Sequence, residues 1–213
     1  MARLRLVLVV ILFSATPIFA GDVTPTHAIS CGDTLGPGGN FKLQQDLDCS
    51  GTSLPALNVR DGAVLDLNGH IVTCRNLGPC MSLLGADTQV FDGVVGGALH
   101  VNLRVEGNGH TVRNVTSGVA DGNVVVEGDN NHLINVWAGA GLPNGVFGAI
   151  AITGDNNELI NSIAPCSALG IGACVSVGGD GNRLTNNFVT VEAAAASVSA
   201  IIDRKSTRLN SSH

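Results

Sequence analysis

Three aspartates recur at one position of a repeated motif and are candidates for binding a cation. Asp129, Asp155 and Asp180 each follow a glycine directly, and Asn108 holds the same place upstream. If these residues stack, neighbouring carboxylates lie about 4.8 Å apart and repel one another unless water or a cation intervenes. Carboxylate oxygens suit Ca²⁺. The alternative, which we prefer, is that Asp fits a turn that Asn108 fits equally well.

A second group of residues is suited to acid–base chemistry. Arg104, Glu106 and Glu127 fall on positions predicted to point outward, where they are candidate catalytic groups beside a sugar. The alternative is a solvated surface ion pair. His110 and His132 lie one repeat apart and are candidates to share a metal, but no third ligand stands at a matching offset, so we assign them to turns.

A repeat in the chain positions both groups. The octets GNGHTVRN, GDNNHLIN, GDNNELIN and GDGNRLTN begin at Gly107, Gly128, Gly154 and Gly179, which gives spacings of 21, 26 and 25 residues. Periods of this length are typical of repeat architectures, whose units bury their apolar faces only by stacking. The glycine and asparagine at the start of each octet favour a sharp turn.

Apolar residues on both sides of that turn predict strands. Residues four and two places before each glycine are apolar and alternate with small or polar ones, which indicates a strand with one buried face. We expect one inward column made of Val105, Val126, Ile152 and Val177. A second inward-facing strand is predicted from the residues five and nine places after the glycine: Val112, Leu133, Leu159 and Leu184, then Thr116, Trp137, Ile163 and Phe188. About six coils are visible in all.

An asparagine ends every octet. These residues, Asn114, Asn135, Asn161 and Asn186, interrupt an otherwise inward apolar series. A buried amide without partners costs about 1–3 kcal/mol. Amides stacked at the strand spacing can instead bond to the coils above and below. The sequence therefore predicts a buried asparagine ladder, with exposed loop asparagines as the alternative.

The unit G-[ND]-[GN]-[NH]-x-[VL]-x-N resembles the repeat of right-handed parallel β-helix proteins, the broad group that includes pectate-lyase-like folds. Upstream, CGDTL at 31–35, DLDCSG at 46–51 and LDLNGHIV at 65–72 resemble the leading segment of bacterial members. The resemblance covers most of 28–202 and implies an all-β, right-handed, single-stranded parallel β-helix, or solenoid. It also implies a use for the acidic column, because pectate-lyase-like enzymes use acidic clusters with Ca²⁺ on a flank of the helix.

Leucine-rich repeats are the alternative fold, since they have a compatible period and a recurring asparagine. The strands here are Val and Ile alternations, and the L-x-x-L-x-L-x-x-N spacing is absent. The six-residue period of left-handed β-helices is also absent. We therefore expect residues 57–202 to form the β-helix, incomplete at its C-terminus, after an N-terminal cap at 21–56.

The first twenty residues predict export. Basic residues precede the apolar run Leu6–Phe13, and small residues surround Ala20, a pattern typical of a secretory signal peptide over 1–20. The run is too short to span a bilayer, so no transmembrane anchor is expected. The predicted location is secreted or periplasmic.

The last eleven residues differ from the repeat. The segment DRKSTRLNSSH at 203–213 resembles translated sequencing-adapter sequence. We interpret it as a non-native tail and expect it to make no specific packing contacts. The β-helix would then break off near Ile202.

Charge and composition limit the partners. Residues 21–202 contain six Lys and Arg against sixteen Asp and Glu, so the net charge is 6 − 16 = −10. Nucleic acid is excluded, because phosphate binding needs a basic surface. Polysaccharide is a candidate partner and a monomer is expected. Sugar-binding surfaces commonly present aromatic platforms, yet the chain has one Trp and no Tyr.

Six cysteines fall in three sequence-local pairs in the exported part: Cys31 and Cys49, Cys74 and Cys80, Cys166 and Cys174. An even count in an oxidising compartment favours disulfides, although six cysteines permit 15 connectivities. We choose the local pairing. The competing interpretation is zinc, for which the two shorter spacings are unsuitable.

Two functions stay open. A non-catalytic surface or periplasmic scaffold, or a carbohydrate-facing binding module, fits the small outward residues and the scarcity of convergent charges. A polysaccharide lyase or epimerase acting on uronic-acid polymers fits the resemblance and the acidic column, but a fold alone does not establish activity. The discriminating feature is a lysine or arginine base beside carboxylates on neighbouring coils.

Overall fold

The computed structural model describes residues 28–52, 55–75, 78–98, 101–118, 123–139, 149–167, 173–192, 199–203 and 208–210. All regular structure in these ranges is β, and every strand pairing in them is parallel. No helix in the described ranges is long and apolar enough to cross a membrane. The predicted signal peptide lies outside the described residues.

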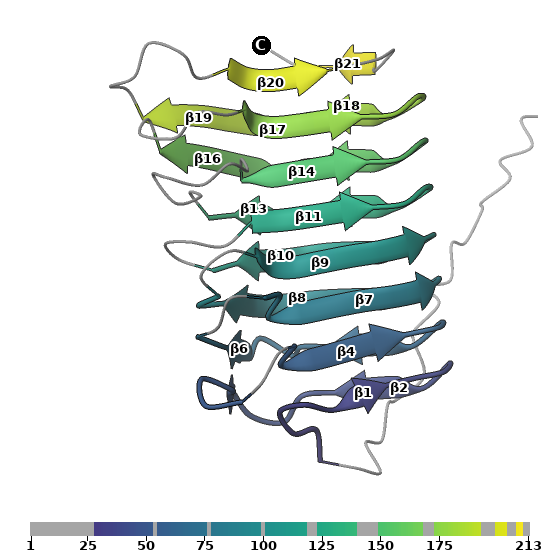
Figure 1. Cartoon of the computed structure of the whole chain (residues 1–213), viewed down its shortest axis with the longest axis vertical. Helices are drawn as coiled ribbons and strands as arrows, with labels where there is room; N and C mark the ends of the chain where they lie inside the picture. The colour runs from purple at the N-terminus through teal and green to yellow at the C-terminus, as the bar shows by residue number, and fades with distance from the viewer. Residues whose placement is uncertain are drawn as a thin grey trace, which may run out of the picture.

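One sheet stacks eight strands in the order β1-β4-β7-β9-β11-β14-β17-β20, which we call the first sheet (Figure 1). Its strands are β1 Thr34–Leu35, β4 Leu57–Arg60, β7 Met81–Ala86, β9 Val101–Asn108, β11 Asn123–Glu127, β14 Ile150–Thr153, β17 Ala173–Gly178 and β20 Ser199–Asp203. From β4 onward each pairs with a strand about 20–30 residues earlier in the chain, as successive coils of a solenoid do.

A 13-stranded second sheet closes each coil through two branches. The middle branch contains β2 Asn40–Lys42, β5 Val64–Asp66, β12 His132–Ile134, β15 Glu158–Ile160, β18 Arg183–Thr185 and β21 Arg208–Asn210. The last branch contains β3 Leu47–Asp48, β6 Ile71–Thr73, β13 Trp137–Ala138, β16 Ile163–Ser167 and β19 Phe188–Glu192. The longer strands β8 Gln89–Gly96 and β10 Thr111–Ser117 run through both branches.

The expected parallel β-helix is confirmed. The six strands β4, β7, β9, β11, β14 and β17 form successive rungs of the first sheet, joined by five turns of the chain. Val105, Val126, Ile152 and Val177 pair in one register and are buried, as predicted. Val112, Leu133, Leu159 and Leu184 form a second inward column on the other wall.

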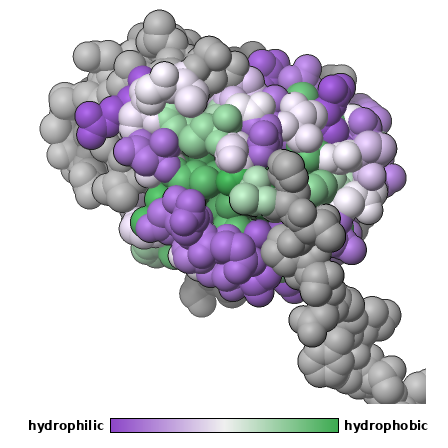
Figure 2. All heavy atoms as spheres, turned by 90° about the horizontal axis from the view of Figure 1, so that it is seen from below, coloured by the Kyte–Doolittle hydropathy of each residue, from purple (hydrophilic) through white to green (hydrophobic). Residues whose placement is uncertain are grey.

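Aliphatic side chains fill the interior of the solenoid. The four described aromatic residues, Phe41, Phe91, Trp137 and Phe188, are absent from the buried set. Figure 2 looks onto the N-terminal end of the stack, where apolar residues occupy the centre and hydrophilic residues surround them. The interior is therefore an aliphatic column that runs along the solenoid axis.

One predicted inward column points outward. Trp137, Ile163 and Phe188 are exposed, and the residues before them in the chain are buried or half-buried. The reason is the asparagine two residues earlier, which has positive φ in every coil, as at Asn135 with φ 54°. A left-handed residue breaks the two-residue alternation of a strand, so the side chains after it change face.

One disulfide lies within the cap and another within an early coil. Cys31 is bonded to Cys49 and Cys74 to Cys80, with Cα–Cα distances of 5.5 and 5.7 Å. These two predicted pairs are confirmed, and the zinc alternative is wrong for their four cysteines. Cys174 is also disulfide-bonded, whereas the side chain of its predicted partner Cys166 lies outside the described set.

The expectation that the tail makes no specific contacts is wrong. Asp203 pairs with Val177, and Arg208–Asn210 pair in parallel with Arg183–Thr185. The physical reason is that the last rung of a parallel stack offers unpaired backbone N–H and C=O groups, which bond to an extended segment whatever its sequence. That 203–213 is non-native stays an interpretation of its sequence.

Candidate binding face

The octet-ending asparagines lie at an exposed corner between the middle and last branches, so their predicted burial is wrong. Asn114, Asn135, Asn161 and Asn186 have φ values of 50–55°, a conformation that asparagine tolerates better than most residues. Stacking of amides is nevertheless present. Asn135 Nδ2 donates to Asn114 Oδ1 over 2.9 Å, and Asn114 Nδ2 donates to Asp92 Oδ1 over 2.7 Å. We call these four residues the corner asparagines.

A buried asparagine ladder lies earlier in the same coils, at the glycine turn, three residues after the repeat glycine. We call Asn131, Asn157 and Asn182 the buried asparagines. The backbone N–H of Asn131 donates to Asn157 Oδ1 over 2.9 Å, and that of Asn157 donates to Asn182 Oδ1 over 2.8 Å. Each Nδ2 donates to a backbone carbonyl of the preceding coil, as Asn157 does to Gly128 O over 2.9 Å. Parity with the inward leucines two residues later would have predicted this placement.

His110 occupies the place of an asparagine in this ladder. Its ring is fully buried, Nδ1 accepts the Thr88 N–H over 3.2 Å, and Nε2 lies 3.3 Å from Glu106 O. Burial lowers the pKa of His110, against the raising influence of the Glu106 carbonyl and the carboxylates of Asp87 and Asp61. The histidine is therefore a neutral structural link.

His132 lies apart from that ring, on the outer face of the middle branch. Its Nδ1 is 3.2 Å from Glu158 Oε2, and Glu158 Oε1 is 3.6 Å from Arg183 Nη1. These three residues occupy one register position on β12, β15 and β18. A metal shared by His110 and His132 is not assembled here, because one ring is buried and the other is half-exposed and paired to a carboxylate.

The acidic column serves the turn of each coil. Asp155 N donates to Asp129 Oδ1 over 2.7 Å, and Asp180 N donates to Asp155 Oδ1 over 2.7 Å. Asn108 Oδ1 accepts the Asp129 N–H in the same way over 2.8 Å, so an amide fits as well as a carboxylate. No three His, Cys, Asp or Glu side chains of the described residues are grouped as a metal site. Calcium binding by this column stays a prediction.

The predicted acid–base group does come together, on the outer face of the first sheet. Arg104 Nη2 lies 2.6 Å from Glu127 Oε2 on the next coil, and Arg104 Nε lies 3.3 Å from Glu106 Oε2. The hydrogen bond that Arg104 donates to Glu127 raises the pKa of Arg104, and the charges of Glu127 and Glu106 add to the effect. All three side chains are substantially exposed. The group is a charged cluster on an open surface.

A row of exposed apolar side chains runs along the last branch, and sequence reasoning placed it in the core. Trp137 is 48% exposed, Ile163 43% and Phe188 62%. The three residues hold one register position on β13, β16 and β19, so they stack along the solenoid axis. We call them the apolar row. Two residues earlier on each coil stands a corner asparagine, so amides and apolar groups run side by side.

The segments that carry the row are uncharged. Residues 115–117, 137–138, 163–165 and 188–190 contain no Asp, Glu, Lys, Arg or His. Thr116 and Val94 continue the register toward the N-terminus with smaller, half-buried side chains, and Ile71, 41% exposed, ends it. The large exposed side chains of the row are thus grouped on the coils of β13, β16 and β19.

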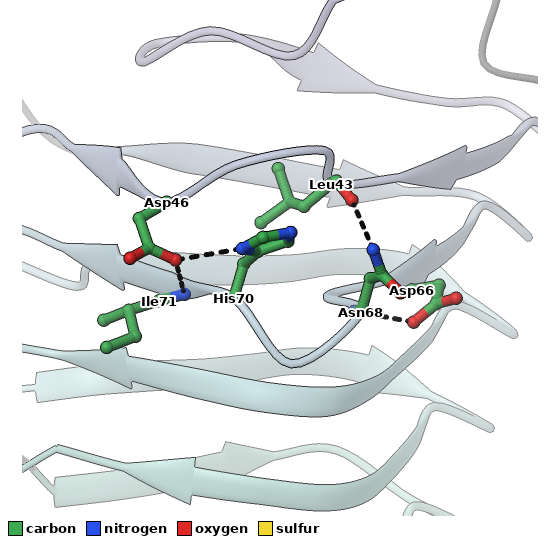
Figure 3. A network of polar contacts seen from close by, with 6 residues as sticks. All are labelled: Leu43, Asp46, Asp66, Asn68, His70 and Ile71. Atoms are coloured by element: carbon green, nitrogen blue, oxygen red, sulfur yellow. Dashed lines mark hydrogen bonds and ion pairs between the residues drawn. The ribbon is translucent and has the colours of Figure 1, made fainter.

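A polar network holds Ile71 and its turn against the cap (Figure 3). Asp46 Oδ1 accepts the Ile71 N–H over 3.0 Å and lies 3.0 Å from His70 Nδ1, and Asn68 Nδ2 donates to Leu43 O over 3.1 Å. The Ile71 N–H lowers the pKa of Asp46, with help from His70. Because most of these bonds reach backbone atoms, the network positions the first coils.

Comparison with protein-family models, curated proteins and solved structures finds no match for this chain. The parallel β-solenoid and its disulfides fit an extracellular repeat protein. Any narrower function rests on the surface chemistry of the chain itself.

Proposed function

We propose that this protein is a non-catalytic, extracytoplasmic binding module that docks on polysaccharide through the apolar row. The observation that carries the proposal is the exposure of Trp137 and Phe188 in a chain with so few aromatic residues. Burial of a large apolar side chain stabilises a fold by about 1.5–3 kcal/mol. The interior is built of Val, Leu and Ile, and the three stacked residues of the row do not contribute this free energy because they stay on the surface. Large apolar side chains that are exposed side by side are typical of a binding surface.

The shape of the surface favours a linear polymer. The row has one large side chain on each coil and is bordered by the corner asparagines. Stable protein partners bury roughly 800 Å² on each side, around a compact apolar centre. A sugar chain needs only a narrow apolar strip for its C–H faces and polar groups beside it for its hydroxyls. The binding-module proposal therefore takes polysaccharide as its ligand.

A lyase or epimerase acting on uronic-acid polymers is the second candidate. It is favoured by Arg104, which lies against carboxylates on its own coil and the next, as such a site requires. A general base must be unprotonated, however, and Glu127 raises the pKa of Arg104. The cluster is therefore better suited to a surface ion pair, and we rank the binding module first.

Affinity electrophoresis through gels that contain soluble polysaccharides tests the proposal. The wild-type chain should be retarded, and Trp137→Ala with Phe188→Ala should abolish the retardation. Phe91→Ala is the matched control, because Phe91 is an outward aromatic on β8 that contacts Arg113 on another face. Equal melting temperatures would show that the variants fold. Retardation that survives the double variant, or release of unsaturated uronic products that requires Arg104, would overturn the proposal.

A further inference from the structure

We propose that the apolar row binds a neutral, equatorially linked β-glycan that lies along the solenoid axis, with one sugar on each coil. This inference rests on the proposed function and adds the ligand class and its direction. It follows from the spacing of the row, from the amides beside it and from the distribution of charge.

The spacing selects an extended chain. Register places Trp137, Ile163 and Phe188 on consecutive coils, about 4.8 Å apart, a step comparable to the advance of one sugar in an extended β-glycan. Successive sugars in such a chain are turned over, so every second sugar presents the same face. Trp137 and Phe188 stand two coils apart and therefore meet equivalent faces, while Ile163 contacts the sugar between them.

The corner asparagines supply hydrogen bonds in a fixed direction. One N–H of Asn135 and one of Asn114 donate along the column toward the N-terminus. An amide has two N–H donors and two acceptor lone pairs, so each of these side chains retains capacity for a sugar hydroxyl. Because the amides of Asn135 and Asn114 are linked to each other, they are ordered before the ligand arrives, which lowers the entropic cost of binding.

Charge selects a neutral ligand. Residues 137–138, 163–165 and 188–190, which carry the row, include no charged residue, and residues 21–202 have a net charge of −10. A polyanion such as a uronic-acid polymer would be repelled by the negative domain, and the residues that carry the row supply no cation to bind it. A glucan of the starch type is axially linked and coiled, so it would diverge from the straight apolar row after contacting one or two of its side chains.

Calorimetric titration with oligosaccharides of increasing length tests the geometry. Cellulose-, chitin- and mannan-derived series from disaccharide to hexasaccharide are the probes, with starch-derived and galacturonate series as comparators. Affinity should rise with each sugar up to the tri- or tetrasaccharide and then level off for at least one β-linked series. Loss of the middle contact in Ile163→Ala should weaken tetrasaccharide binding about tenfold, since each sugar buries apolar area on one side chain.

Ile71→Ala is the matched control for Ile163→Ala. The two isoleucines have the same register and nearly equal exposure, 41% and 43%, but Ile71 is separated from the apolar row by Val94 and Thr116. Its loss should leave affinity within about twofold. Binding that is independent of chain length, stronger for starch-type or galacturonate chains, or equally weakened by both variants would overturn the inference while leaving a polysaccharide-binding function. Absence of binding to every polysaccharide would overturn both.

Discussion

The two asparagine columns use one residue type for opposite purposes. The buried asparagines close a hydrogen-bonded ladder inside the solenoid, where each amide satisfies a backbone N–H and a backbone C=O. The corner asparagines occupy positive φ on the surface, where Asn135 donates to Asn114 and Asn114 donates to Asp92. In the first column the side chain is indispensable, whereas in the second the backbone conformation matters most.

Breaking the buried ladder should have the largest effect. Asn157→Ala leaves the Asn131 N–H and the Gly128 carbonyl without partners, so we expect the free energy of unfolding to fall by about 2–5 kcal/mol. Chemical denaturation measures it. Asn156→Gly is the control, because Asn156 is exposed at φ 56° and Gly181 holds the same place one coil later. An unchanged midpoint in Asn157→Ala would mean that the ladder is dispensable.

A corner substitution should cost less, and for another reason. Leucine at the positive φ of Asn135 is strained, so Asn135→Leu should lower the free energy of unfolding by about 1–2 kcal/mol. Asn135→Gly loses the same amide contact to Asn114 without the strain and should cost only a few tenths of a kcal/mol. Equal losses in the two variants would show that the exposed amide bonds, rather than the backbone, carry the corner.

The histidine in the buried ladder should make stability depend on pH. Because burial lowers the pKa of His110 in the folded state, the unfolded chain takes up the proton first as the pH falls below about 6.5. Stability should be full above that pH and decline below it, until the folded-state pKa is reached. His110→Asn restores the repeat residue and should remove this part of the decline. If the melting temperatures of both proteins fell equally from pH 7 to 5, His110 would not be the neutral buried residue inferred here.

The smallest effect is expected in the acidic column. Asp155→Asn retains an Oδ1 acceptor for the Asp180 N–H, so its stability without calcium should lie within about 0.5 kcal/mol of the wild type. Calorimetry in calcium and in chelator separates turn chemistry from cation binding. If the carboxylates share Ca²⁺, calcium raises the melting temperature of the wild type only. An identical response in both proteins would leave the column as a turn element.

Much of the fold could be predicted from the sequence, because strand periodicity and repeat spacing are local properties. The valine column before each glycine and the leucine column after it lie where alternation placed them. Local disulfides were predictable for a similar reason, since Cys31 and Cys49 meet within one coil of chain. The candidate site was harder to predict, because a strictly alternating pattern assigns Trp137 to the core.

The sequence by itself determined that successive coils stack in chain order, and it determined the inward columns on both sides of the glycine turn. Only the tertiary structure decided that the corner asparagines and the apolar row after them face solvent. The physical reason is a backbone angle: one left-handed residue at each corner shifts the alternation of the strand that follows it. Residue type permits that angle at Asn135, but the closure of the coil imposes it.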